Sequence, residues 1–161
     1  MFLSNPEIIA RLLTSMVLAG IIGAEREYRG KPAGVRTNVM VGLGATLMTI
    51  SSIKVIDIFP RITGVDPTRI AAQIITGIGF IGAGAILHKS ESHVIGLTTA
   101  AVIWVVAGIG MAVGLGLYTE AIVTTGLVFG VFLFMHKFVK AIRYFRGTRH
   151  PEAVEDSKNS E

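Results

Sequence analysis

The chain has 161 residues, of which 51% are hydrophobic and only 16% charged, whereas an ordinary soluble domain carries about a quarter charged residues. The formal net charge is +4, but the basic residues flank apolar blocks and do not line one solvated face, which excludes a nucleic-acid-binding protein. The absence of cysteine excludes a disulfide framework and thiol chemistry.

Five apolar blocks follow one another along the chain, and charged residues fall between them. A bilayer core needs about 20 mostly apolar residues per spanning helix. We therefore predict an all-α, polytopic membrane protein with five transmembrane helices, which cover about residues 7–25, 34–56, 69–88, 94–115 and 118–139. The first block has the apolar character of a signal peptide, but Glu7 precedes it and no small-residue cleavage site leads into a soluble domain, so we expect a retained helix.

The distribution of lysine and arginine between the loops predicts the orientation, because cytoplasmic loops are enriched in both. Eleven of them lie on the side of the 26–36 loop, the 88–93 loop and the carboxyl terminus, and four lie on the other side. The amino terminus is therefore expected outside and the carboxyl terminus in the cytoplasm. Residues 1–145 would form the transmembrane domain, whose basic end lies near anionic headgroups, and residues 146–161 a disordered cytoplasmic tail.

The end of the first helix and the loop after it concentrate charge at the predicted membrane boundary. Glu25 ends the first apolar block, and Arg29 and Arg36 follow in the loop. Topology alone explains the cations, but a carboxylate at the edge of the hydrocarbon is costly without a partner. We expect Glu25 to be held by Arg29 or Arg36 and to have a functional role. In the second helix, Asn38 opens a stripe of polar and small residues that either packs tightly or faces an internal polar site.

The third helix contains four glycines, Gly77, Gly79, Gly82 and Gly84, and three of them fit the pattern GxGxxG. A dinucleotide fingerprint needs a preceding strand and a tight turn. Here Asp66 and Pro67 form a typical helix start about ten residues earlier, with Asp66 at the N-cap. We therefore predict that the glycines lie inside a helix, make a close crossing with a neighbouring helix and bind no nucleotide. A local hinge is the alternative.

Polar residues and further small residues accompany these glycines. Arg69, Gln73 and Gly77 lie close to one line of the third helix, and Arg69 is expected to reach the membrane interface with its long side chain. The fourth helix has a predicted packing face beside Trp104, made of Gly96, Ala100, Ala107 and Gly114. Helices with glycine on opposite faces need many neighbours, which favours a homo-oligomer, in the simplest case a dimer.

Catalytic and metal-binding patterns are missing from the sequence. It contains no GxSxG, HExxH or P-loop pattern. His88 and His93 are five positions apart, which is not the spacing of a helical metal pair. Glu25 and Asp66 are expected on opposite sides of the membrane, so they cannot share one ion in a static structure. We predict no enzyme activity, no cofactor and no metal site.

Three segments carry a resemblance to a known family. In this order, GAEREYRGKPAGVRTN, DPTRIAAQIITGIGFIGAGAIL and GLTTAAVIWVVAGIGMAVGLGLY resemble the signature segments of the MgtC/SapB family of bacterial inner-membrane proteins, over about residues 15–120. The resemblance implies a five-helix membrane domain, to which many members add a cytoplasmic domain of the ACT type that we do not expect here. It also implies a role in adaptation to low magnesium and, in pathogens, in survival inside macrophages. The matching family positions include Glu25, Arg29, Arg36, Asp66, Arg69, Gln73, Gly96, Thr98, Thr99 and Trp104.

Two hypotheses for the function follow. Some members of the family are linked to the proton-driven ATP synthase, and none has an assigned enzyme activity, so the first hypothesis is a regulator that contacts an ATP synthase or a cation transporter within the lipid bilayer. The second is a small oligomeric transporter or channel that moves an ion past Asn38, Gln73 and Thr98, between the Glu25 and Asp66 ends. The sequence shows no inverted repeats of the kind that many transporters have, which favours the regulator.

Overall fold

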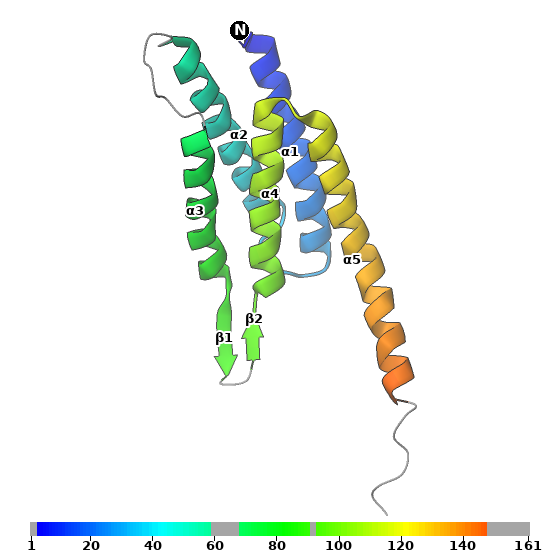
Figure 1. Cartoon of the computed structure of the whole chain (residues 1–161). Helices are drawn as coiled ribbons and strands as arrows, with labels where there is room; N and C mark the ends of the chain where they lie inside the picture. Colours follow the sequence, from blue (N-terminus) through cyan, green and yellow to red (C-terminus); the bar gives the residue numbers. More distant parts are fainter. Residues whose placement is uncertain (1–2, 59–67, 91–92, 148–161) are drawn as a thin grey trace, which may run out of the picture. The chain divides into compact units, whose positions relative to one another are not determined.

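The computed structural model describes residues 3–58, 68–90 and 93–147. Within them the chain forms the helices α1 (Asn5–Tyr28), α2 (Val35–Ile58), α3 (Thr68–Ala85), α4 (Leu97–Leu115) and α5 (Tyr118–Gly147) (Figure 1). Four of them, α1, α2, α4 and α5, contain stretches that are long and apolar enough to cross a membrane, and α3 contributes the shorter apolar stretch Arg69–Ala85. The predicted helical, multi-pass membrane protein is confirmed to this extent, and its orientation stays a prediction.

The chain divides into two units, residues 1–126 and 127–161. The first unit contains α1 to α4, and the second contains the larger part of α5. In the first unit α2 and α4 run in the same direction and pack against each other, while α1 packs on both of them in the opposite direction (Figure 1). Helix α3 packs mainly against α4 and touches α2 less extensively. Their shared core consists of buried aliphatic side chains that include Ile22, Ile74, Ile103, Val106 and Ile109.

Small residues let the central helices approach closely. A Cβ atom on Gly42 of α2 would lie 2.9 Å from the Ala19 Cβ of α1, and a Cβ on Gly114 of α4 would lie 2.7 Å from the Thr49 Cβ of α2. A Cβ on Gly110 of α4 would collide with the Gly42 carbonyl oxygen. The α1–α2 and α2–α4 crossings therefore depend on glycine, as is common for helices packed in a membrane.

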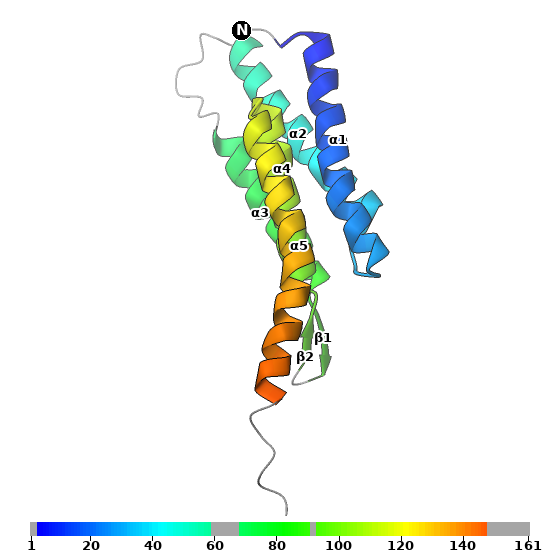
Figure 2. The same cartoon turned by 90° about the vertical axis from the view of Figure 1, so that its right-hand side faces the viewer.

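A β-hairpin between α3 and α4 corrects the predicted element bounds. Strands β1 (Leu87–Ser90) and β2 (His93–Ile95) pair antiparallel and continue from the ends of the two helices (Figures 1 and 2). The predicted third helix therefore ends too late and the fourth begins too early. Gly96, which was predicted to lie on a packing face of the fourth helix, instead precedes α4 with a φ of 102°, a conformation that favours glycine.

The ends of the other helices differ less from the prediction. Helices α1 and α2 extend two or three residues beyond the predicted bounds at their carboxyl ends, and α5 continues to Gly147, well beyond residue 139. The predicted tail of residues 146–161 lies outside the described residues from residue 148 onward. We call the end of the first unit where α1 and α3 finish the hairpin end, and the end where they begin the amino-terminal end.

Candidate functional site

Buried charges gather where α1 finishes, at the hairpin end of the first unit. Glu25 and Arg29 are one helical turn apart on α1, and the Arg29 Nε lies 2.5 Å from the Glu25 Oε1. The Glu25 side chain is only 6% exposed, whereas that of Arg29 is 31% exposed. On the same helix, the buried Arg26 donates a hydrogen bond of 3.3 Å from its Nη2 to the Thr99 Oγ1 of α4. Of the two predicted partners of Glu25, Arg29 and Arg36, the structure shows Arg29 in an ion pair with it. We call Glu25, Arg26, Arg29 and Thr99 the α1–α4 polar cluster.

The turn from α1 to α2 is fixed by side chains from both helices. The Glu27 Oε2 accepts a hydrogen bond of 2.8 Å from the backbone N–H of Val35 and so satisfies a donor at the start of α2. The Asn38 Nδ2 donates to the carbonyl oxygens of Ala33 and Gly34, the latter at 2.9 Å. Asn38 is fully buried, and its Oδ1 has no hydrogen-bond partner within the described residues. This amide therefore holds the turn, and its buried Oδ1 is left as an acceptor oxygen without a described donor.

The predicted stripe of α2, made of Asn38, Gly42, Ala45, Thr49 and Ser52 with Thr46 beside it, is buried along its length. Its threonine hydroxyls bond to the carbonyl one turn earlier, as the Thr46 Oγ1 does with the Gly42 oxygen at 2.9 Å and the Thr49 Oγ1 with the Ala45 oxygen at 2.7 Å. The Thr46 hydroxyl also lies 2.8 Å from the Gly110 carbonyl oxygen of α4. These contacts support the tight-packing alternative for the stripe.

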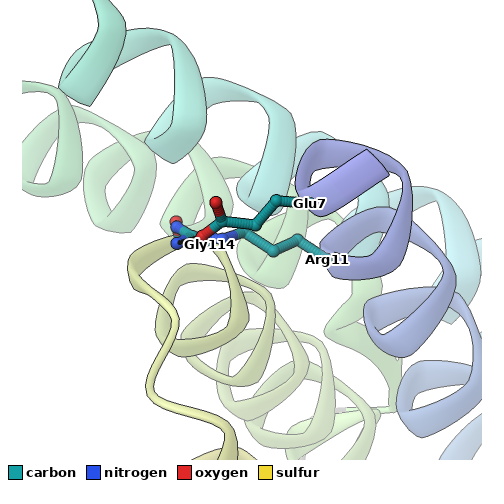
Figure 3. Close-up of polar contacts among 3 residues, drawn as sticks. All are labelled: Glu7, Arg11 and Gly114. Atoms are coloured by element: carbon teal, nitrogen blue, oxygen red, sulfur yellow. Dashed lines mark hydrogen bonds and ion pairs between the residues drawn. The ribbon is translucent and has the colours of Figure 1, made fainter. Parts of the chain in front are cut away.

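A second buried charge lies at the amino-terminal end, and the sequence analysis did not single it out. Arg11 of α1 donates from its Nη1 to the Gly114 carbonyl oxygen of α4 and from its Nη2 to the Glu7 Oε1 at 2.6 Å (Figure 3). The last carbonyls of a helix lack intrahelical donors and carry partial negative charge, so a guanidinium there is favourable. The sequence contains a signal for this pairing, because Arg11 follows Glu7 by four residues, or one helical turn, within an apolar block. Arg11 therefore fastens α1 to the end of α4.

The remaining polar residues of the predicted site do not meet in one place. Arg36, Arg69, Gln73 and Thr98 are exposed, whereas Thr99 is buried in the α1–α4 polar cluster, and Asp66 lies outside the described residues. Gln73 is near the start of α3, and the start of α3 and the end of α1 are at opposite ends of the first unit (Figure 1). Among the described residues, no group of three or more His, Cys, Asp or Glu could hold a metal ion.

The predicted close crossing of the glycines of α3 is not found within the described chain. Cβ atoms on Gly77, Gly79 and Gly84 would meet no atom of a described neighbour within 4 Å, and one on Gly82 would make an ordinary contact of 3.6 Å with the Ala100 Cβ. Trp104, predicted beside a packing face, is 53% exposed. A crossing at Gly77, Gly79 or Gly84 with a helix other than α1, α2 and α4 stays a prediction.

Helix α3 presents two different open surfaces. Its small-residue face consists of the exposed residues Ala72, Thr76, Gly79 and Ala83, which helical spacing places on one side. A second surface, the α2–α3 groove, has a volume of about 560 Å³. Its lining includes Met40 and Met48 of α2 and Ile70, Gln73, Gly77 and Ile81 of α3.

Comparisons with known proteins agree on one family. A sequence model of the MgtC family matches residues 12–141. The protein named "Putative magnesium transporter YhiD" of Escherichia coli K12 is 49% identical over 131 residues, which cover 78% of this chain and 60% of that protein. Protein SapB of Bacillus subtilis is 44% identical over 73% of this chain and 51% of its own length, and Protein MgtC of Salmonella typhimurium LT2 is 45% identical over 74% and 48%. The chain thus spans about half to three fifths of the length of these relatives. No solved structure matches it.

Proposed function

The chain belongs to the MgtC family, and from this membership and the open face of α3 we propose that it is a non-enzymatic regulator of ion homeostasis in the bacterial inner membrane. Its relatives include a protein named a putative magnesium transporter, which supports a role connected with magnesium. The regulator acts by helix-to-helix contact within the bilayer. The neighbour is a helix of a membrane partner, such as an ATP synthase or a cation transporter, or of a second copy of the chain.

The observation that carries this proposal is the small-residue face of α3. Ala72, Thr76, Gly79 and Ala83 are all exposed, and a Cβ on Gly79 would meet no described neighbour within 4 Å. In hydrocarbon there is no hydrophobic drive between helices, so association depends on close packing, which small residues allow. A face of this kind, on a helix that packs mainly against α4 with its other side, is suited to receive another helix.

The interior of the first unit also favours regulation over conduction through one chain. Between the α1–α4 polar cluster and Arg11, the core contains Ile22, Ile103, Val106 and Ile109, which are each at most 2% exposed. A hydrated ion would have to displace these close-packed side chains.

We place the amino terminus outside and the carboxyl terminus in the cytoplasm, as the lysine and arginine distribution predicts.

The test is complementation of a bacterial strain that lacks the gene and grows poorly in low magnesium. Gly79→Leu should abolish rescue, because it fills the small-residue face, while the amount of protein in the membrane stays the same. Gly108→Leu on α4 is the matched control, because a Cβ there also meets no described neighbour within 4 Å. Full rescue by Gly79→Leu would overturn the role of this face.

An oligomeric ion transporter is the second candidate. It is favoured by the buried carboxylate of Glu25, by the buried Asn38 Oδ1, which has no hydrogen-bond partner among the described residues, and by the name of the Escherichia coli relative. Such oxygens are the ligands that magnesium prefers. Purified protein in liposomes that contain a magnesium indicator separates the two candidates. Magnesium entry that depends on Glu25 and Asn38 would favour the transporter, and its absence in liposomes with correctly inserted protein would favour the regulator.

A further inference from the structure

We propose that the α2–α3 groove binds one acyl chain of a phospholipid, whose phosphate lies at Arg69 and whose ester carbonyl lies at Gln73. This site is independent of the proposed regulatory contact, because the groove and the small-residue face are different surfaces of α3. Three features of the groove identify its occupant, namely its chemistry, its length and the order of polar groups along α3.

The chemistry of the groove requires an apolar occupant. Its lining residues are aliphatic side chains, methionine and glycine, with Gln73 as the polar exception. Both flanking helices contain membrane-compatible apolar stretches, Val35–Val55 in α2 and Arg69–Ala85 in α3. An open surface at this depth contacts hydrocarbon and not water, so the groove takes up an acyl chain or an apolar protein segment.

The length of the groove favours an acyl chain over a spanning helix. Along α3 the lining runs from Ile70 to Ile81, which at the helical rise corresponds to about 16 Å. This is about half of the hydrocarbon thickness, or one leaflet. A transmembrane helix of a partner would contact α3 over its whole length, whereas the acyl chain of one lipid reaches from the interface to the middle of the bilayer.

The order of groups along α3 matches the order of groups in a phospholipid. Arg69, Gln73 and Gly77 follow one another at intervals of one helical turn, and all three are exposed. The guanidinium of Arg69 is suited to the phosphate, and the amide of Gln73 can donate to the ester carbonyl. Helical side chains lean toward the amino terminus of the helix, which brings the Gln73 amide closer to the interface. Below it, Gly77 has no Cβ, and this leaves width for the hydrocarbon chain.

The experiment uses the full chain in vesicles of phosphatidylethanolamine and phosphatidylglycerol, with a tracer of phosphatidylethanolamine that carries a diazirine in one acyl chain. After illumination, labelled peptides are identified by mass spectrometry. We expect the label to concentrate on Met40, Met48 and their neighbours in the groove. Gly77→Leu fills the groove and should remove this label. Gly79→Leu places the same side chain two residues away on the small-residue face and should leave the label in place.

Three results would overturn the proposal. The groove label could persist in Gly77→Leu, or it could be no stronger than the label on the exposed residues Leu13 and Val17 of α1, which would mean ordinary lipid contact. The third result comes from the variant Met48→Cys, which introduces a single cysteine into a chain that otherwise has none. Efficient disulfide-linked dimers through Met48→Cys would assign the groove to a second copy. Growth rescue is measured separately from lipid labelling. The lipid proposal fails if Gly77→Leu keeps the label, and the proposed regulatory contact fails if Gly79→Leu still rescues growth. Either proposal can therefore fail without the other.

Discussion

Adding one methyl group at Gly110 tests the close crossing of α2 and α4. The residue lies on α4 where the helix passes the Gly42 carbonyl group of α2. A Cβ on Gly110 would collide with the Gly42 oxygen and lie 3.1 Å from the Ala45 Cβ. The first of these neighbours belongs to the backbone and cannot rotate away. Gly110→Ala must therefore push α2 and α4 apart along a crossing that also carries the contact between Thr46 and the Gly110 oxygen.

The expected loss follows from the cost of overpacking. Inserting a methyl group into a close-packed core typically costs about 1–3 kcal/mol. Weakening the hydrogen bond from Thr46 to the Gly110 oxygen adds up to about 1 kcal/mol. Alanine recovers part of this, because glycine is less favourable in a helix by about 1 kcal/mol. Gly110→Ala should therefore lower the free energy of unfolding by up to about 3 kcal/mol.

Gly108→Ala on the same helix is the control for this measurement. A Cβ there would meet no described neighbour within 4 Å, so the change should only gain helix propensity and leave stability equal or higher. Unfolding of both purified variants in mixed micelles, followed by circular dichroism as the denaturing detergent increases, gives the two free energies. If Gly110→Ala is as stable as Gly108→Ala, the close α2–α4 crossing is wrong.

The remaining predictions concern the charges at the two ends of the first unit and the orientation of the chain. Glu25→Ala removes the carboxylate that pairs with Arg29, and we expect loss of growth in low magnesium with unchanged membrane content, so normal growth of this variant would contradict a functional role for Glu25. Arg11→Met keeps an apolar stem but deletes the donors to Gly114 and Glu7, and it should cost about 2–4 kcal/mol of unfolding free energy. Glu7→Gln should cost less, because the Glu7 side chain is 41% exposed, and equal stabilities of the two variants would argue against the clamp. A topology reporter fused after residue 145 should report a cytoplasmic carboxyl terminus, and activity only in the periplasm would reverse the proposed orientation.

The sequence predicts the helices well because apolar blocks and their flanking charges are local features. It also predicts the pairing of Glu25 with Arg29, since the two residues are one helical turn apart. The β-hairpin was missed because strands of four and three residues are too short to show a period in the sequence. The continuation of α5 beyond residue 139 agrees with the basic composition of residues 136–150, which is typical of the interfacial end of a membrane helix.

Periodicity shows which residues share a face of a helix, but it does not show which face has a neighbour. Gly77 and Gly110 both lie inside apolar helices, yet Gly110 meets the backbone of α2 and Gly77 borders an open groove. The role of Arg11 could not be predicted for the same reason. In the sequence it contributes one positive charge to the orientation count, and only the fold brings it to Gly114, which is 103 positions away. Contacts between distant segments depend on packing geometry, which no local pattern contains.

The β-hairpin also sets how α3 and its neighbours fit the thickness of a bilayer. The outer edges of a two-stranded hairpin carry backbone groups without ladder partners, which hydrocarbon does not tolerate, so the hairpin must lie beyond the membrane boundary. Helix α3, which ends at that boundary, has 18 residues, or about 27 Å, slightly less than the hydrocarbon thickness of about 30 Å. Helix α1 has 24 residues, or about 36 Å, but its apolar block covers only about residues 7–25, or about 28 Å, and Arg26 and Glu27 follow it. The apolar stretch Arg69–Ala85 of α3 is the shorter of the two, so we expect the bilayer to be thinner beside α3 than beside α1.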